Sequence, residues 1–149
     1  NKLVTSRKKE LEHFKEEELP QRFAELKGEY FPVPQTRVAP VEGAIQGMGC
    51  CSGSVSGKFI VVDEHTDLSQ DFSGYIVIAK FFEPGWINIY TQASGIIAER
   101  GNLLSHASII ARELNLPAIV GAKGIIEGIK NSQSINMNGT TGIVYLKDE

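Results

Sequence analysis

The segment with the clearest chemical potential is residues 99–121, where His106 directly follows Ser105. An apolar strand runs into a turn at Gly101, and an amphipathic helix is expected to begin at Ser105. The first N–H groups of a helix have no partner inside it, and that end carries partial positive charge, so an anion is stabilised there. An imidazole nitrogen attacks phosphorus readily, and the phosphoramidate formed remains a phosphoryl donor. We therefore predict that His106 accepts and passes on a phosphoryl group.

Four neighbouring residues are predicted to stabilise that phosphoryl group. Ser105 is a typical N-cap residue whose hydroxyl could also reach a phosphoryl oxygen, and Ser108 in the first turn could do the same. Arg100 is a candidate charged partner, and Gly101 allows a sharp turn and the close approach of a nucleotide or acceptor.

Arg112 is a weaker candidate for a phosphate contact. It lies on the expected helix close to Glu113 and, through the turn, to Glu99. We expect its guanidinium to face solvent or to pair with one of these two glutamates.

The other histidines and the two cysteines do not indicate a functional site. His13 lies in a charged segment and His65 in a polar one, so both are expected to be ordinary surface residues. The adjacent pair Cys50 and Cys51 lacks the spacing of a metal site, and neighbouring cysteines rarely bridge each other. We expect two reduced thiols and no metal site; a redox or metal-binding role is the alternative.

Two other uses of His106 are less consistent with the sequence. A hydrolase built on Ser105 and His106 needs an orienting carboxylate, and none is evident; adjacent side chains at a helix start also project in different directions. A metal-binding module using His106 with the cysteines would lack ligand spacing. Both are weaker than a phosphocarrier.

Composition sets further limits. The chain has 149 residues, 42% of them hydrophobic and 22% charged, which is typical of one globular domain with an appendage. A net charge of −3 disfavours non-specific nucleic-acid binding. No apolar run approaches the roughly 20 residues that cross a membrane, and no signal peptide is evident. We expect a cytoplasmic protein with neither nucleic-acid nor membrane partners.

The chain divides into three predicted parts. Residues 1–30 form a charged helical segment, with a solvated helix over about 3–18 and a second short helix through Leu19, Phe23 and Leu26. Residues 31–40 form a proline-rich, semi-rigid connector. Residues 41–149 form the main domain. Because the sequence opens on Asn1, we expect a piece of a longer protein or a trimmed chain.

The main domain alternates strands and helices. Four strands are expected over 58–62, 75–79, 95–98 and 118–120. Helices are expected from Pro84, which fits a first helical position, over 105–114, and over 124–129. Residues 134–138 and 143–146 form a hairpin. This order predicts an α/β fold, a mixed sheet with flanking helices.

The run from Glu99 to Gly121 resembles the phosphohistidine signature of the PEP-utilising enzymes. These include phosphoenolpyruvate synthase, pyruvate phosphate dikinase, enzyme I of the sugar phosphotransferase system and rifampicin phosphotransferase. Their pattern is close to E-x-G-G-x-[TL]-S-H-x-x-[IV]-x-A-R-x-x-x-[IL]-P-A-[IV]-V-G. The similarity extends over about 43–146, through the segments 47–57, 75–79, 83–86 and 133–144. The preceding charged helix and connector also resemble the rifampicin-phosphotransferase-like branch.

The resemblance implies a swivelling β/β/α domain whose histidine, here His106, is phosphorylated at one site and discharged at another. In the dikinases an ATP-grasp domain supplies the β-phosphate of ATP. ATP and Mg²⁺ are therefore expected at other domains of a parent enzyme, with no cofactor in this fragment. The expected partners are that ATP-grasp domain, an acceptor-binding domain and a small acceptor such as pyruvate. The final acceptor is left open, and this chain alone should not turn over ATP.

Two positions depart from the family pattern. Asn102 replaces the second glycine, which we expect to cost the turn some freedom, and Leu104 stands where many members have threonine. These departures support one alternative: a non-catalytic swivelling domain kept as an interaction or regulatory module.

Overall fold

The computed structural model describes residues 4–9, 12, 23–26, 29–32 and 43–147. The chain divides into two compact units, residues 1–37 and 38–149. The three-part division at 1–30, 31–40 and 41–149 stays a prediction.

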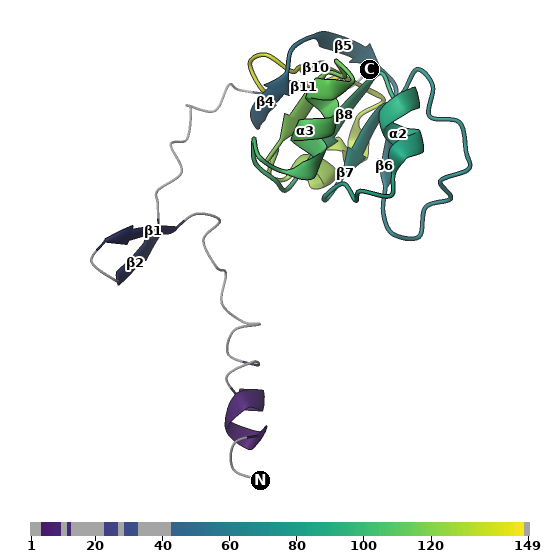
Figure 1. Cartoon of the computed structure of the whole chain (residues 1–149). Helices are drawn as coiled ribbons and strands as arrows, with labels where there is room; N and C mark the ends of the chain where they lie inside the picture. Colours follow the sequence, from purple (N-terminus) through teal and green to yellow (C-terminus); the bar gives the residue numbers. More distant parts are fainter. Residues whose placement is uncertain (1–3, 10–11, 13–22, 27–28, 33–42, 148–149) are drawn as a thin grey trace. The chain divides into compact units, whose positions relative to one another are not determined.

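In the first unit, residues 4–9 and 12 are helical, and the rest of the helix expected over 3–18 lies outside the described residues. The second predicted helix is wrong: strand β1 (Phe23–Leu26) pairs antiparallel with β2 (Glu29–Pro32), as Figure 1 shows. Gly28 disfavours a continuous helix, and Tyr30 and Phe31 favour a strand. Residues 31 and 32 therefore belong to a strand; the remainder of the expected connector, 33–40, is not described.

The second unit is built on a mixed five-stranded sheet of order β4-β9-β8-β7-β6 (Figure 1). Its four consecutive strands β6 to β9 are parallel, and β4 joins the edge antiparallel to β9. The strands are β4 (Met48–Cys51), β6 (Phe59–Val62), β7 (Ile76–Ala79), β8 (Gly95–Ala98) and β9 (Ala118–Val120). Every residue of β7, β8 and β9 is buried, which requires a layer on each face.

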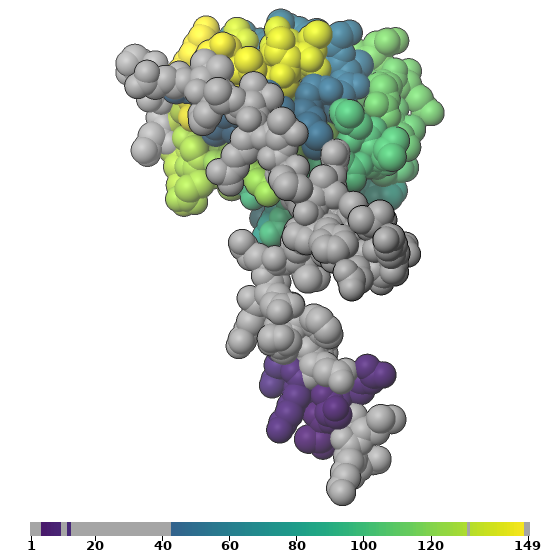
Figure 2. Space-filling model, turned by 90° about the vertical axis from the view of Figure 1, so that its left-hand side faces the viewer, coloured from purple at the N-terminus to yellow at the C-terminus, as the bar shows by residue number. Residues whose placement is uncertain are grey.

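One covering layer is an antiparallel sheet of order β3-β11-β10-β5. Its strands are β3 (Ala44–Gln46), β5 (Ser54–Gly57), β10 (Ser134–Asn138) and β11 (Ile143–Lys147). The C-terminal strands lie beside the β3–β5 segment, seen as yellow atoms next to blue ones in Figure 2. Alternate residues of the central strands, such as Ile76, Ile97 and Ile119, pack with Ile135 and Met137 of this sheet in one apolar core.

Helices form the other layer. Two helices, α2 (Ile87–Gln92) and α3 (His106–Glu113), contribute Tyr90, Ala107 and Ala111 to a second core with Val77 and Val120. The short helix α4 (Ile125–Gly128) and the 3₁₀ turn after it (Ile129–Asn131) instead place isoleucines in the core between the sheets. The second unit is therefore a three-layer β/β/α domain, and the predicted fold class is confirmed.

Three details differ from the sequence prediction. The Gly- and Ser-rich stretch before residue 58 forms β3, β4 and β5, which pair only with strands distant in the chain. The larger helices cover one face of the mixed sheet, since the second sheet occupies the other. Pro84 lies in a turn closed by the Trp86 N–H and the Glu83 carbonyl at 3.2 Å, and α2 begins only at Ile87. Proline also suits the second position of such a turn.

No helix among the residues that the structure describes has the length and apolar content needed to span a membrane.

Candidate phosphohistidine site

His106 is the first residue of α3 and is exposed. The loop before it leaves β8 at the carboxyl edge of the parallel strands, where ligand sites of α/β sheets commonly form. Backbone hydrogen bonds tie this loop to its neighbours: the Arg100 N–H donates to the Lys80 carbonyl at 2.8 Å, and the Ala122 N–H to the Ala98 carbonyl at 3.1 Å. The sheet thus fixes where the histidine-bearing loop begins.

Gly101 makes the first sharp turn of this loop. Its φ of +128° lies in a region that side chains rarely adopt, and a Cβ there would lie 3.4 Å from the Ser105 Oγ. The sharp turn predicted at Gly101 is present, while the close approach of a nucleotide or acceptor there stays a prediction.

Asn102 holds the next part of the loop through three hydrogen bonds. Its side-chain Oδ1 accepts the Leu104 N–H at 2.8 Å, and its carbonyl accepts the Ser105 N–H at 3.0 Å and the Ser108 hydroxyl at 2.7 Å. Asn102 has no positive φ, so the expected cost of replacing glycine does not arise. The side-chain bond is an Asx turn, a common role for asparagine.

Ser105 occupies the N-cap position but does not cap the helix. Its φ of −66° and ψ of 155° are those of a cap residue, yet its side chain makes no capping hydrogen bond. The Ser105 Oγ lies 3.0 Å from the Ser108 Oγ instead. Because Ser108 has one hydroxyl proton, which it donates to Asn102, Ser105 must be the donor between the two serines.

Arg112 braces the loop from the last turn of α3. It is exposed, as expected, but its guanidinium donates to the Leu103 carbonyl at 2.8 Å. Of the two expected alternatives, exposure to solvent therefore holds: no ion pair of Arg112 with a glutamate is found among the described residues, and Glu99 accepts the Ile126 N–H at 3.4 Å. Leu104, directly after the braced carbonyl, is 83% exposed.

The structure brings most of the predicted site residues together, but they differ in how exposed they are to solvent. Gly101, Ser105 and Ser108 are in contact beside His106, while Ser108 is fully buried. Arg100 is exposed, and no salt bridge is found for it among the described residues. Sequence reasoning missed the role of Asn102, although an asparagine two residues before Leu104 is a recognisable Asx-turn signal.

The cysteines lie beneath this helix as free thiols. The buried Cys50 donates its S–H to the Ala118 carbonyl at 3.3 Å. Burial raises the pKa of the Cys50 thiol and outweighs the smaller lowering effects of the neighbouring Ser108 and Arg112 side chains. A thiol held protonated in this way is a poor nucleophile and a poor metal ligand. Among the described residues, no cluster of three or more His, Cys, Asp or Glu side chains could hold a metal ion.

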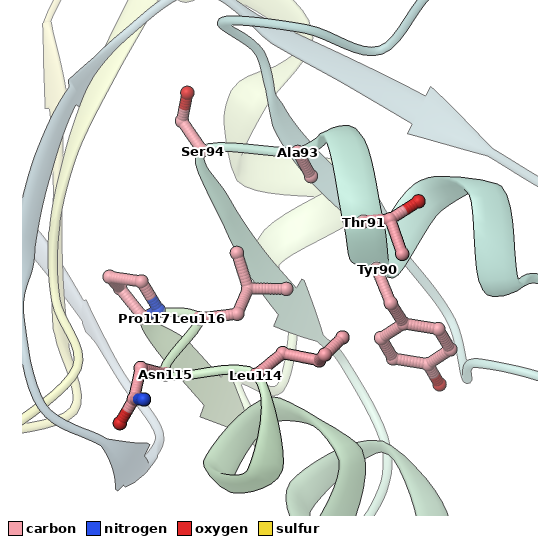
Figure 3. Close-up of a pocket in the computed structure, with 8 residues that line it drawn as sticks. All are labelled: Tyr90, Thr91, Ala93, Ser94, Leu114, Asn115, Leu116 and Pro117. Atoms are coloured by element: carbon pink, nitrogen blue, oxygen red, sulfur yellow. The ribbon is translucent and has the colours of Figure 1, made fainter.

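A separate pocket of about 400 Å³ lies at the other end of α3 from His106 (Figure 3). The ends of α2 and α3 line it, and in Figure 3 the Leu114 side chain points toward the Tyr90 ring. Its lining residues are Tyr90, Thr91, Ala93, Ser94, Leu114, Asn115, Leu116 and Pro117. No charged side chain is among them, so this pocket supplies no positive charge for a phosphoryl group.

Comparison with known families assigns the fold and the loop together. Residues 72–142 match the family described as "PEP-utilising enzyme, mobile domain". This part of the chain belongs to that family. The matched region contains β7 to β10, α3 and the whole loop that carries His106.

Curated relatives agree with this assignment. The chain is 29% identical over 133 residues to a probable phosphoenolpyruvate synthase of Staphylothermus marinus, which covers 88% of this chain and 16% of that protein. It is 34% identical over 104 residues to the rifampicin phosphotransferase of Bacillus subtilis, covering 70% of this chain and 12% of that protein. The chain therefore spans 12% to 16% of the length of these multidomain phosphotransferases.

A more distant solved structure supports the fold alone. Aconitase X from Thermococcus kodakaraensis superposes with a TM-score of 0.55 at 12% identity, over 70% of this chain and 98% of the matched chain. This likeness shows that the β/β/α architecture is not confined to proteins named as phosphotransferases.

Proposed function

We propose that the second unit is the phosphocarrier domain of a dikinase-type phosphotransferase and that His106 carries the phosphoryl group. The observation that carries this proposal is an exposed histidine at the first position of α3, on a braced loop inside the family match. An exposed ring can meet a donor and then an acceptor, which a buried one could not.

The transfer step uses few groups of this chain. A ring nitrogen of His106 attacks phosphorus, the bond from phosphorus to the leaving group breaks, and the leaving group keeps the electron pair. The ring keeps the proton on its other nitrogen. Backbone N–H groups of the first turn face the transferred oxygens, and the exposed Arg100 supplies positive charge. Gly101, without a side chain, allows close approach.

Donor and acceptor belong to other parts of the proposed enzyme. We propose that an ATP-grasp domain supplies a phosphoryl group from ATP with Mg²⁺, as the β-phosphate, and that an acceptor-binding domain presents pyruvate or another small molecule. A cytoplasmic location is part of the same proposal. The names of the relatives, phosphoenolpyruvate synthase and rifampicin phosphotransferase, suggest two acceptor classes.

The test is the intact mass of the parent enzyme after brief exposure to ATP and Mg²⁺, with His106→Ala alongside. We expect a single phosphoryl group, labile in acid and stable in alkali, that is absent from the variant. If ATP binds but no phosphoryl group appears, the domain is instead a non-catalytic interaction module and the proposal fails.

A further inference from the structure

The serine pair beside His106 presents a physical puzzle. Serine at an N-cap normally accepts an N–H from the first turn, which stabilises the helix by about 1 kcal/mol. Ser105 has the backbone angles of a cap and forgoes this bond. Something must therefore hold its side chain elsewhere.

Ser108 is the group that holds it. Its side chain is fully buried, which leaves its hydroxyl little freedom to turn. Its proton is fixed on the Asn102 carbonyl at 2.7 Å, so its oxygen accepts from Ser105 at 3.0 Å. The chain of donors runs in one direction, from Ser105 through Ser108 to Asn102.

Asn102 completes the arrangement by keeping its carbonyl in place. The Asx turn to the Leu104 N–H at 2.8 Å and the bond from the Ser105 N–H at 3.0 Å both fix this residue. Gly101, whose φ of +128° side chains rarely adopt, brings the chain past the Ser105 side chain, and a Cβ there would lie 3.4 Å from the Ser105 Oγ.

We propose that Asn102 and Ser108 are positioning residues for the phosphorylation of His106. They hold the Ser105 hydroxyl away from the first turn of α3, so that the phosphoryl oxygens meet backbone N–H groups that a serine cap would occupy. This inference rests on the proposed function. It also revises the expected role of Ser105 and Ser108, which then act on the phosphoryl group through their arrangement and not by donating to it.

The inference predicts an unusual relation between two substitutions. In Ser108→Ala the Ser105 hydroxyl loses its acceptor and turns to cap the helix, which removes an N–H from the phosphoryl group. In Ser105→Ala/Ser108→Ala no hydroxyl is left to form that cap. Adding Ser105→Ala to Ser108→Ala should therefore free that backbone N–H again and restore the rate of phosphoryl addition.

The experiment uses the 149-residue chain and potassium phosphoramidate, a small phosphoryl donor that needs no second domain. His106 attacks phosphorus, the P–N bond of the donor breaks, and ammonia leaves with the electron pair. The rate of phosphoryl addition is followed by intact mass for the wild type, for Ser108→Ala, for Ser105→Ala/Ser108→Ala and for His106→Ala. Ser56→Ala, on an exposed position of β5, is the matched serine control.

We expect Ser108→Ala to slow the addition about tenfold, as expected for one lost hydrogen bond to a charged group. The double variant should return to within about threefold of the wild type, with Ser56→Ala unchanged. A wild-type rate in Ser108→Ala overturns the positioning role, and so does a double variant as slow as the single one, because a purely structural Ser108 gives no rescue.

Two further readouts keep the outcome clear. Circular dichroism reports whether each variant is folded; should Ser108→Ala unfold, Asn102→Ala tests the same arrangement from its other end and should also slow the addition. If folded wild type gains no phosphoryl group at His106, the proposed function itself fails, and the positioning role with it.

Discussion

Two exposed histidines of this domain lie at Asx turns, and the contrast between them shows how differently such a turn can be anchored. At His65, the Asp63 carboxylate accepts the His65 N–H at 3.0 Å and the Thr66 hydroxyl at 2.9 Å, all within one exposed loop. At His106, the turn made by Asn102 is tied to the buried Ser108.

The difference lies in what each turn is attached to. The His65 loop holds itself together, and its histidine precedes no helix. The His106 loop is anchored to β8, to a buried hydroxyl of α3 and, through Arg112, to the end of that helix. Exposure alone does not distinguish the two histidines, and the proposed carrier role is assigned to His106 because its loop is braced at a strand edge.

The largest expected effect separates the two histidines directly. His106→Ala should abolish phosphoryl transfer in the parent enzyme and leave the domain folded, because an exposed side chain contributes little to the core. His65→Ala should leave transfer unchanged. Transfer rates with circular dichroism check both, and unfolding of His106→Ala would count against an exposed carrier.

Gly101→Ala should have the next largest effect. Its φ of +128° strains any side chain, so we expect a loss of about 1–3 kcal/mol in the free energy of unfolding, with slower transfer. Urea denaturation measures the first quantity. Gly85→Ala is the matched control, because Gly85 has no positive φ and open space around it. Equal stabilities of the two variants would show that the turn is not strained.

Arg112→Met tests the brace between the two ends of α3. It keeps an apolar stem but removes the donor to the Leu103 carbonyl, so we expect about 0.5–1.5 kcal/mol of destabilisation. Lys130→Met, which removes an exposed ion pair with Glu127, should cost about 0.5 kcal/mol or less. If thermal melts rank the two variants the other way, the brace contributes nothing.

How far the sequence predicts this molecule depends on how local each interaction is. Strands 95–98 and 118–120 and the start of α3 were predicted closely, since apolar runs, Gly101 and Pro117 mark them within a few residues. The strands β3, β4 and β5 were missed, because Gly- and Ser-rich segments become strands only through partners as distant as β9, β10 and β11. The sparse apolar spacing of Leu19, Phe23 and Leu26 predicts a helix where the structure has the β1–β2 hairpin.

The site follows the same rule. The turn at Gly101 and the place of His106 at the start of α3 are predictable because a glycine and an N-cap serine mark them locally, while their chemical roles stay predictions. The direction of the Ser105 hydroxyl is not predictable, since it depends on the burial of Ser108 and the position of the Asn102 carbonyl, both set by the fold.

The smallest expected effect is a difference in acid sensitivity between the two turns. Hydrogen bonds from Thr66 and from the His65 N–H lower the pKa of Asp63 below its ordinary value of 3.8. A carboxyl group with a lowered pKa stabilises the folded loop above pH 3.8, and this contribution is lost as the pH falls through the lower folded-state value.

The Asn102 turn has no such titrating group. In an NMR titration below pH 4, the His65 amide signal should shift while that of Leu104 stays in place. A parallel shift of both signals would mean that acid loosens the domain as a whole and that the two turns do not differ.

Locating the phosphoryl group on the chain shows whether His106 is the carrier. The parent enzyme, exposed to ATP and Mg²⁺ and digested at alkaline pH, is fragmented in a mass spectrometer. We predict the phosphoryl group on His106. Its presence on His65, on Ser105 or on no residue of this domain would contradict the account.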